Sequence, residues 1–409
     1  AAIAEVVVEE TKKSKRPVIM CWMGGRQVEA AKKIFIQNKV PFFDSPNAAV
    51  EAFSFLTQFQ KNQKLLLEVP APLSRQSESD IQGAKMLLKD AMGNHPSFLS
   101  PPTIKALMRA FGIPVTRGIL CHSPQEALVA AEELGFPVAL KIDSPQIIHK
   151  SDVNGVILGV QDAYSVKKKY HELVHHIQMN YPDKTIRGVM IEKMVIKPHA
   201  REIMVGVAND PTFGRLISFG MGGTWVEILR DQQFSLPPLN EKLIENLMQK
   251  TRAHEVLGKI RNSPPADRQD LVRILMGISE MICEIPEIQE IDLNPIMVDE
   301  EGAVVSDARV KVDPNDSTME NYAHLAISPY PSSLKRTFQL PSGKEVIVRP
   351  IRPEDAAIEE EFVNNLSPES RYFRFMGSLQ HLSREMLIRF TQIDYYKEMA
   401  FIAVIYEGN

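Results

Sequence analysis

The chain has 409 residues, with 47 Lys and Arg against 51 Asp and Glu, and a net charge of -4. This near balance argues against a nucleic-acid partner, which favours a basic face, and no apolar run reaches the ~18–20 residues that cross a bilayer. The 3 cysteines lie far apart in the sequence and predict neither a disulfide framework nor a zinc site. We therefore expect a cytoplasmic protein of about two to four domains.

The first part of the chain alternates strands with helices. Residues 17–22 and 40–43 predict short strands, residues 27–37 predict a helix, and Pro46 begins a second helix. This alternation indicates a parallel sheet. Residues 68–80 contain prolines and serines and are typical of a linker.

The middle block is richer in helix signals. Pro101 begins a helix that ends at Gly112, and Ser123 caps another helix that ends at Gly135. A strand is expected at 114–121, and the apolar residues 138–142 predict a buried strand.

Composition changes again near Asp313. Residues 313–343 hold four prolines and many Ser and Asn with weak periodicity, and they predict a linker. Beyond them we expect a strand at 345–349, helices at 353–365 and 383–391, and a strand at 399–406.

A lysine ends the buried strand of the middle block. The run from Phe136 to Ile142 is apolar except for Lys141. Burying an ammonium group is costly unless an anion lies beside it, and phosphate oxygens would supply one. The alternative is a lysine whose head group reaches solvent at the strand end.

His149 follows two apolar residues and precedes a polar turn that ends at Gly155. Such a turn can present backbone N–H groups to a phosphate. A neutral imidazole can also accept a phosphoryl group as a nucleophile. A purely structural histidine is the alternative.

Residues 189–194 predict a strand that meets a polar hinge. Adenine needs an acceptor for its amino group and apolar surfaces for its faces. Glu192 and Met194 can supply these, and an ordinary surface ion pair between Glu192 and Lys193 is the alternative.

A glycine-rich loop contains Gly220, Gly222 and Gly223. Glycines let backbone amides approach an anion closely, so the loop is a candidate for phosphate binding. Most glycine loops are only turns, and that alternative stays open.

Three oxygen-bearing residues form the strongest motif. Asp292 and Asn294 occupy alternate positions of a predicted strand, and Asp307 ends the next strand after a short hairpin. Alternate strand positions face one way, so we expect these side chains to converge. Two or three oxygen ligands together with nucleotide phosphates suit Mg²⁺.

The order and spacing of these motifs resemble the ATP-grasp half of the NDP-forming acyl-CoA synthetases, the superfamily that includes succinyl-CoA synthetase, over residues 99–312. The resemblance is carried by Lys141, His149-Lys-Ser-Asp-Val, Glu192, Ala-Arg-Glu202, Gly220-Met-Gly-Gly, and Asp292-Leu-Asn294-Pro with Asp307. Residues 17–60, with Cys-Trp-Met-Gly-Gly, resemble the end of the CoA-ligase module that precedes ATP-grasp in single-chain members.

The last segment resembles the opening of a GNAT acetyltransferase domain. It contains Val346-Ile-Val-Arg-Pro-Ile-Arg-Pro and later Glu369-Ser-Arg371-Tyr-Phe-Arg374-Phe375. A synthetase-like body followed by GNAT is the layout of Pat-type protein lysine acetyltransferases. The resemblance therefore implies a bifunctional parent protein, and we expect this chain to be a fragment that lacks acetyltransferase activity by itself.

The resemblance implies an α/β multidomain fold. We expect the C-terminal part of a flavodoxin-like CoA-ligase domain at 1–66, a linker and helix at 67–98, an α+β ATP-grasp domain of two subdomains at 99–312, a linker at 313–343, and the N-terminal part of a GNAT domain at 344–409.

The resemblance also implies roles for individual residues. They are nucleotide binding by Lys141, Glu192, Lys193 and Met194; phosphate binding by Gly220, Gly222 and Gly223; Mg²⁺ coordination by Asp292, Asn294 and Asp307; and catalysis by His149 with Glu202. His149 would take a phosphoryl group from the ligase module and pass it to ADP. Asn154 stands where the family usually has a glycine.

The implied ligands are ATP or ADP, Mg²⁺ and an acyl-CoA such as acetyl-CoA, with protein lysines as substrates of the full-length GNAT domain. A homo-oligomer is compatible with the family. Two alternatives to the acetyltransferase parent stay open. One is an active ADP-forming acetate–CoA ligase with a phosphohistidine relay, and the other is a catalytically silent module that senses nucleotide or acyl-CoA.

Overall fold

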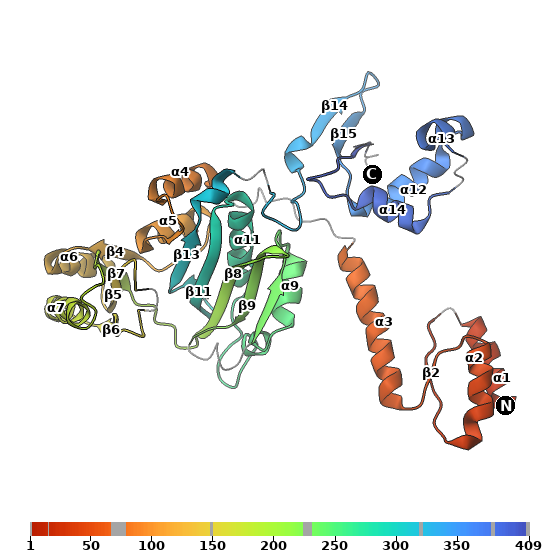
Figure 1. Cartoon of the computed structure of the whole chain (residues 1–409), viewed down its shortest axis with the longest axis horizontal. Coiled ribbons are helices and arrows are strands. Elements are labelled where there is room, and N and C mark those ends of the chain that lie inside the picture. Colours follow the sequence, from red (N-terminus) through yellow and green to blue (C-terminus); the bar gives the residue numbers. More distant parts are fainter. Residues whose placement is uncertain are drawn as a thin grey trace. The chain divides into compact units, whose positions relative to one another are not determined.

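The computed structural model describes residues 2–14, 16–66, 79–147, 150–223, 231–318, 322–377 and 381–405. The chain divides into two compact units. The first unit combines Ala1–Val69 with Arg352–Gln392, and the second combines Pro70–Ile351 with Ile393–Asn409. Figure 1 labels the elements along the chain.

A seven-stranded sheet forms the body of the second unit. Its strand order is β10-β9-β8-β11-β13-β3, and β12 pairs with β11. The strands are β3 (Ser97–Phe98), β8 (Arg201–Asp210), β9 (Gly214–Met221), β10 (Gln232–Ser235), β11 (Ile288–Asp299), β12 (Gly302–Val305) and β13 (Ala308–Val312). All of their pairings are antiparallel.

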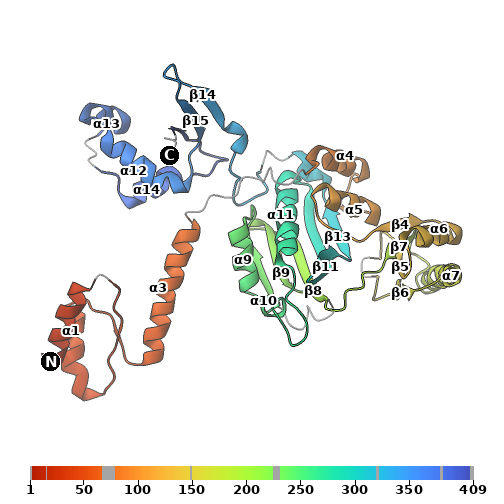
Figure 2. The same ribbon diagram turned by 180° about the vertical axis from the view of Figure 1, so that it is seen from behind.

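Helices bury one side of this larger sheet, and Figure 2 shows α9 and α11 in front of it. The helices are α4 (Ile81–Ala91), α5 (Pro101–Ala110), α9 (Glu241–Gln249), α10 (Ala253–Val256) and α11 (Arg268–Glu284). In α11, Leu271, Ile274, Leu275 and Ile278 follow helical spacing and are fully buried. Burying each such side chain contributes roughly 1.5–3 kcal/mol.

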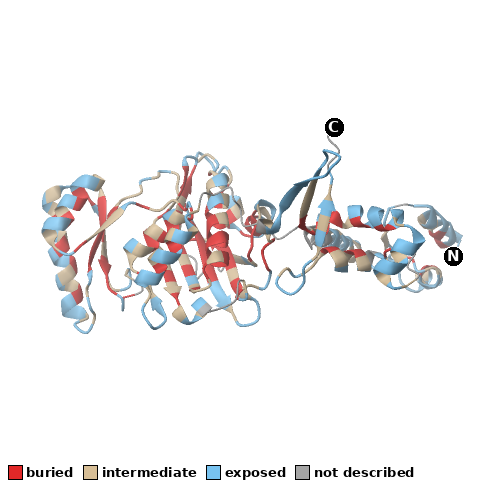
Figure 3. Ribbon diagram, turned by 90° about the horizontal axis from the view of Figure 1, so that it is seen from above, coloured by how far each residue is buried: buried red, intermediate tan, exposed pale blue. Residues whose placement is uncertain are grey.

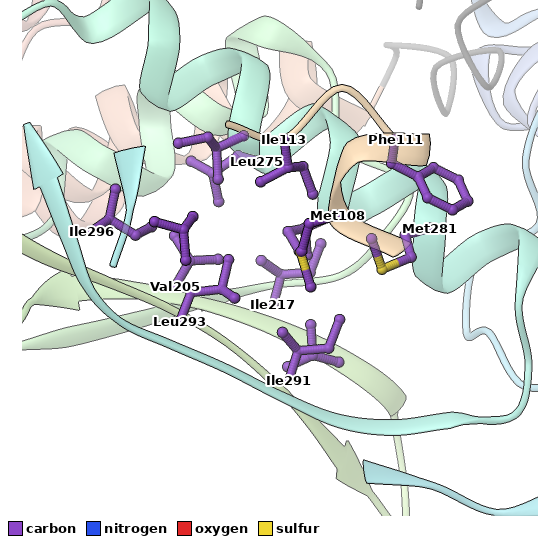
Figure 4. Close-up of a cluster of buried hydrophobic side chains, with 14 of the residues drawn as sticks. Met108, Phe111, Ile113, Val205, Ile217, Leu275, Met281, Ile291, Leu293 and Ile296 are labelled. Carbon is purple, nitrogen blue, oxygen red and sulfur yellow. The ribbon is translucent and has the colours of Figure 1, made fainter. Parts of the chain in front are cut away.

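The larger core joins helix and strand side chains, as Figure 4 shows for Met108, Leu275 and Leu293. In Figure 3 buried residues are concentrated where the helices meet the sheet. This packing fixes the position of the strands and turns that carry the candidate site residues.

A smaller, four-stranded antiparallel sheet has the order β4-β7-β5-β6. Its strands are β4 (Gly118–Cys121), β5 (Val138–Asp143), β6 (Val156–Val160) and β7 (Gly188–Lys193), and α6 (Pro124–Leu134) and α7 (Ala163–Asn180) pack on it. This sheet has its own core, with Ala131, Leu140 and Leu173 fully or almost fully buried. The residues between 99 and 312 therefore form an α+β structure with two subdomains, as predicted for the ATP-grasp domain.

The strand expected at 114–121 is divided between the two sheets. Val305 donates its N–H to the Pro114 carbonyl at 2.9 Å, and Thr116 donates its N–H to the Val305 carbonyl at 3.0 Å. Only Gly118–Cys121 forms a strand of the smaller sheet. The prediction of one strand was wrong because the chain crosses between the subdomains here.

Three further strands of the second unit lie within or after the region expected as a linker. The sheet order is β14 (Arg336–Gln339), β15 (Glu345–Pro350) and β16 (Phe401–Val404). The linker predicted at 313–343 thus contains β14, together with the short helices η3 (Pro314–Thr318) and η4 (Ser332–Leu334). Pairing with β15, rather than the composition of β14 itself, makes this segment a strand.

The first unit contains the predicted parallel pair of strands. These are β1 (Met20–Cys21) and β2 (Phe42–Phe43), accompanied by α1 (Ala2–Lys13), η1 (Arg26–Val28), α2 (Glu29–Gln37) and α3 (Pro46–Leu66). Its C-terminal part holds η5 (Pro353–Asp355), α12 (Ala356–Asn365), α13 (Pro368–Phe375) and α14 (Arg384–Thr391). No helix in the described ranges is long and apolar enough to cross a membrane.

Candidate active site

Lys141 and Glu192 form a buried ion pair within the smaller sheet. Lys141 lies on β5 and Glu192 lies on the neighbouring strand β7. The Lys141 Nζ is 2.8 Å from Glu192 Oε2, and the two side chains are only 13% and 7% exposed. The anion expected beside Lys141 is thus present as a carboxylate of the protein itself.

The same lysine reaches the larger sheet. Its Nζ donates to the Ser306 carbonyl at 2.9 Å and lies 3.4 Å from Asp307 Oδ1. Ser306 and Asp307 form the turn between β12 and β13. The structure therefore brings Lys141, Glu192 and Asp307 together from three distant segments.

A second buried lysine completes this cluster. Lys105 on α5 is 2.9 Å from Glu192 Oε1, and it donates to the backbone carbonyl of Thr116 at 2.9 Å and to its hydroxyl at 2.8 Å. Our sequence analysis missed Lys105. The spacing of the helix could have identified Lys105. Residues 101, 104, 105 and 108 fall on one helix face that is otherwise apolar, and a lysine on a buried face is rare unless it is paired.

The pKa values of the two lysines that share Glu192 are shifted in opposite directions. Burial opposes the charge on Lys141, but the carboxylates of Glu192 and Asp307 outweigh it and raise the pKa of Lys141 above its ordinary 10.5. Burial is also the largest influence on Lys105, where Glu192 only partly offsets it, so the pKa of Lys105 falls below its ordinary value. Lys105 is therefore the easier of the two to deprotonate.

A pocket opens at this cluster, between the two subdomains. Its polar lining consists of Lys105, Lys141, Lys150, Glu192, Ser306 and Asp307, and its apolar lining includes Ile104, Val115, Met190 and Val305. Three ammonium groups against two carboxylates leave the lining positive. Among the described residues, the buried Ser306 hydroxyl has no hydrogen-bond partner. Such a lining suits an anion attached to an apolar group.

Lys193 and Met194, which were also predicted to bind the nucleotide, have hydrogen-bond partners outside this cluster. The Lys193 Nζ donates to the carbonyls of Gly135 and Phe136 at 2.9 and 3.0 Å, where it caps the end of α6. The Met194 Sδ accepts from the Gly159 N–H at 3.0 Å. Lys193 therefore has a structural role in this conformation, and Glu192 pairs with Lys105 and Lys141 instead of Lys193.

The glycine loop packs against its own sheet. The Gly222 N–H donates to the Glu202 carbonyl at 2.8 Å, and the Gly223 N–H donates to Asn294 Oδ1 at 2.7 Å. A Cβ on Gly220 would lie 1.9 Å from the Asp231 carbonyl oxygen, and one on Gly223 would lie 1.8 Å from Glu202 Oε2. The glycines allow this close approach, and the amides of Gly222 and Gly223 are already engaged by protein acceptors.

The three proposed metal ligands take different partners. Asp292 Oδ2 lies 3.9 Å from Arg309 on β13, whereas Asn294 accepts from Gly223 and Asp307 faces Lys141. Across the residues with a defined position, no three Asp, Glu, His or Cys side chains group as a metal site. The oxygens of Asn294 and Asp307 are suitable Mg²⁺ donors if nucleotide phosphates complete the shell.

Of the two residues predicted to be catalytic, the structure describes Glu202 but not His149. His149 lies outside the described residues. The turn after it is described, and Asn154 there adopts φ 52°, a left-handed conformation that suits the glycine usual in the family. Glu202 is exposed on β8 beside Gly223, while its neighbour Arg201 is buried and donates to four backbone carbonyls.

Residues 90–312 match the family model for the ATP-grasp domain, which covers more than half of the chain. The chain belongs to the ATP-grasp family. Its ATP-grasp domain is homologous to the corresponding portion of ADP-forming acetate–CoA ligases. The beta subunit of acetate–CoA ligase [ADP-forming] II from Pyrococcus furiosus is 41% identical over 209 residues, 50% of this chain and 88% of that subunit.

A longer ligase matches more of the chain. Acetate–CoA ligase [ADP-forming] I from Archaeoglobus fulgidus is 32% identical over 295 residues, 71% of this chain. The chain spans 42% of that ligase. A shorter match is an acetyltransferase from Pseudomonas aeruginosa, 43% identical over 70 residues, 17% of this chain and 38% of that protein.

Solved structures of an acetyl-coenzyme A synthetase from Ca. Korarchaeum cryptofilum share the fold of the ATP-grasp domain. A complex with coenzyme A and Ca-AMPCP has TM-score 0.54 and 34% identity, and covers 56% of this chain and 99% of that chain. A complex with coenzyme A, acetyl-coenzyme A and a phosphorylated phosphohistidine segment has TM-score 0.51 and 31% identity, and covers 57% of this chain and 100% of that chain. The cluster of Lys141, Glu192 and Asp307 lies within the residues that match the family.

Proposed function

We propose that the ATP-grasp domain binds Mg-ATP or Mg-ADP in the pocket between its subdomains, as the nucleotide-binding part of an ADP-forming acyl-CoA ligase. The observation that carries this proposal is the convergence of Lys141, Glu192 and Asp307 from β5, β7 and the β12–β13 turn. The nucleotide analogue bound by the homologous synthetase supports it. This was an alternative in our sequence analysis, and the ligase relatives favour it over the acetyltransferase parent.

Lys141 would bind the phosphates. Its ammonium group is desolvated and held at the pocket by the carbonyl of Ser306, so its attraction for an anion is stronger than in water. The Ser306 hydroxyl, for which no described residue is a hydrogen-bond partner, can donate to a phosphate oxygen. The apolar lining, with Ile104 and Met190, would cover the adenine ring.

Asn294 and Asp307 would hold the magnesium ion together with phosphate oxygens. Mg²⁺ bound there would neutralise charge on the transferring phosphoryl group. The chain's own part is to fix the oxygens. Gly223 anchors the Asn294 amide by a hydrogen bond, and Lys141 faces one oxygen of Asp307.

His149 would carry the phosphoryl group, and the phosphohistidine segment of the homologous synthetase supports this role. In the direction of ATP synthesis, a terminal phosphate oxygen of ADP attacks the phosphorus on His149. The new P–O bond forms as the P–N bond breaks, and the bonding electron pair returns to the ring nitrogen. Glu202 remains a proposed catalytic neighbour, and acyl-CoA remains the proposed second substrate.

Labelling with γ-labelled Mg-ATP tests the relay. The full chain should acquire acid-labile, base-stable label, His149→Ala should not, and the exposed His95→Ala should label like the parent. Nucleotide binding without label in the parent chain would favour the alternative of a silent sensor of nucleotide or acyl-CoA. Equal labelling of His149→Ala would contradict the role of His149.

An acetyltransferase activity is the second candidate, favoured by the short match to the Pseudomonas protein. It would belong to a GNAT domain that begins with the sheet β14-β15-β16 and helices α12 to α14. Because the chain by itself is expected to lack this activity, the test joins residues 344–409 to the remaining part of the Pseudomonas protein and incubates the chimera with labelled acetyl-CoA and a lysine-containing protein. Transfer of label to lysine would support the bifunctional parent, and a folded chimera that transfers no label would contradict it.

A further inference from the structure

We propose that Lys105 is a positioning residue of the nucleotide site, which holds Glu192 so that Lys141 keeps one N–H and its positive charge available for phosphate. The inference rests on the proposed binding of nucleotide and adds a residue that neither the motifs nor the comparisons assign. It follows from how the donors and acceptors of the cluster are distributed.

Lys105 has no donor left for a ligand. A lysine ammonium has three N–H groups, and those of Lys105 have three acceptors within 2.9 Å. Two of these are the carbonyl and the hydroxyl of Thr116, and the third is Glu192 Oε1. Lys105 is therefore placed to act through Glu192 and not by touching the nucleotide.

Lys141 is less fully engaged. Its Nζ has acceptors at 2.8 Å in Glu192 and 2.9 Å in Ser306, and its next partner is Asp307 Oδ1 at 3.4 Å. This last contact is longer than the roughly 2.7–3.2 Å of a normal N–H···O bond. One N–H of Lys141 can therefore turn to a phosphate oxygen without breaking a strong bond.

The distribution of charge in the cluster also keeps Lys141 available for phosphate. Glu192 gives one oxygen to each lysine, so its negative charge is divided between two ammonium groups. If Lys105 is removed or neutralised, the whole charge of Glu192 falls on Lys141. The pair Lys141–Glu192 is then neutral, and its attraction for phosphate is lost at the low effective dielectric of a buried site.

The pH dependence of binding separates this role from a merely structural one. The charged groups that face Lys105 are Glu192 on β7, Lys141 on β5 and Asp307 in the β12–β13 turn. Because burial lowers the pKa of Lys105, its ammonium group loses its proton at a lower pH than an ordinary lysine does. Nucleotide affinity should therefore fall as Lys105 loses its proton.

The experiment is calorimetric titration of the full chain with Mg-ADP, from neutral pH to about pH 9.5. Lys105→Met should bind ~tenfold more weakly at neutral pH, with little further loss at alkaline pH. Lys105→Arg keeps its charge, so it should bind within about threefold of the parent at neutral pH and lose the alkaline decline. Lys85→Met, which removes a half-exposed lysine of α4 paired with Glu284, should match the parent throughout.

Each outcome decides between the two proposals. If the parent binds Mg-ADP but all variants show its affinity and its alkaline decline, the role of Lys105 is wrong while the nucleotide site stands. If the parent itself does not bind, the proposed function fails. Thermal melting shows whether Lys105→Met is folded, and if it is not, the pH profile of Lys105→Arg alone decides.

Discussion

The backbone N–H of Gly223 donates a 2.7 Å hydrogen bond to the side-chain oxygen of Asn294, 71 residues further along the chain. This bond joins the glycine loop after β9 to the Asp-Leu-Asn-Pro motif of β11. The glycine loop and the Asp-Leu-Asn-Pro motif, which we predicted as separate phosphate and metal sites, are thus joined in one structural feature. The loop fixes the amide whose oxygen we propose as a magnesium donor.

Replacing Asn294 should therefore affect both stability and metal dependence. Asn294→Ala leaves the Gly223 N–H without its acceptor, which should cost about 1 kcal/mol of unfolding free energy. It should also reduce the enhancement of ADP binding by Mg²⁺. Denaturation and calorimetry with and without Mg²⁺ measure the two effects. Asn209→Ala, at an exposed side chain that contacts Gln289, is the control and should change neither.

Glu192 should be among the most sensitive polar positions of the ATP-grasp domain. Glu192→Gln leaves two buried ammonium groups without their shared carboxylate, and breaking a buried pair costs about 3–5 kcal/mol. Urea unfolding followed by circular dichroism measures the loss. Glu172→Gln on α7 removes an exposed pair with Lys169 and should change the stability little, because water and salt screen exposed ion pairs. Equal stability losses for the two variants would contradict the buried cluster.

His324 should make the second unit sensitive to mild acid. Burial lowers the pKa of His324 below its ordinary 6.5, and the nearby Arg215 adds to this, against the opposing hydrogen bond to the Ile282 carbonyl and the charge of Asp316. Below about pH 6.5 the unfolded chain binds a proton that the folded chain resists. Stability should therefore fall as the pH drops from 6.5 to the folded-state pKa of His324, and level off below it.

Unfolding in urea at several pH values tests this, with His324→Gln for comparison. Gln can still donate to the Ile282 carbonyl but does not titrate in this range. The difference in stability between parent and variant should shrink or reverse as the solution is acidified through pH ~6.5. A constant difference would show that His324 does not contribute to the acid sensitivity.

Local signals predicted the elements well where a cap or a turn residue marks the end. Ser123 and Gly135 bound α6 as expected, since the Ser123 hydroxyl accepts from the Glu126 N–H and Gly135 adopts φ 75°. By contrast, β14 lies in a stretch of linker-like composition and exists through its pairing with β15. Pairing partners far along the chain leave no local signal.

In the candidate site, too, the residues with a local sequence signal were predicted and those that depend on distant contacts were not. Lys141 and Glu192 stood out because a charged residue in an apolar strand is conspicuous. Lys105 was overlooked because a lysine in a helix is ordinary until its face is known to be buried. The partners of Lys193 and the engagement of the Gly222 and Gly223 amides depend on the tertiary fold, which spacing alone does not specify.

Binding of Mg-ADP to the full chain and to Lys141→Met, measured by calorimetry at neutral pH, tests the central claim most directly. We predict saturable, magnesium-dependent binding to the parent chain and at least ~tenfold weaker binding to the variant, because the Lys141 ammonium group is placed to meet the phosphates. The same affinity in both chains, or no binding to the parent, would contradict the account.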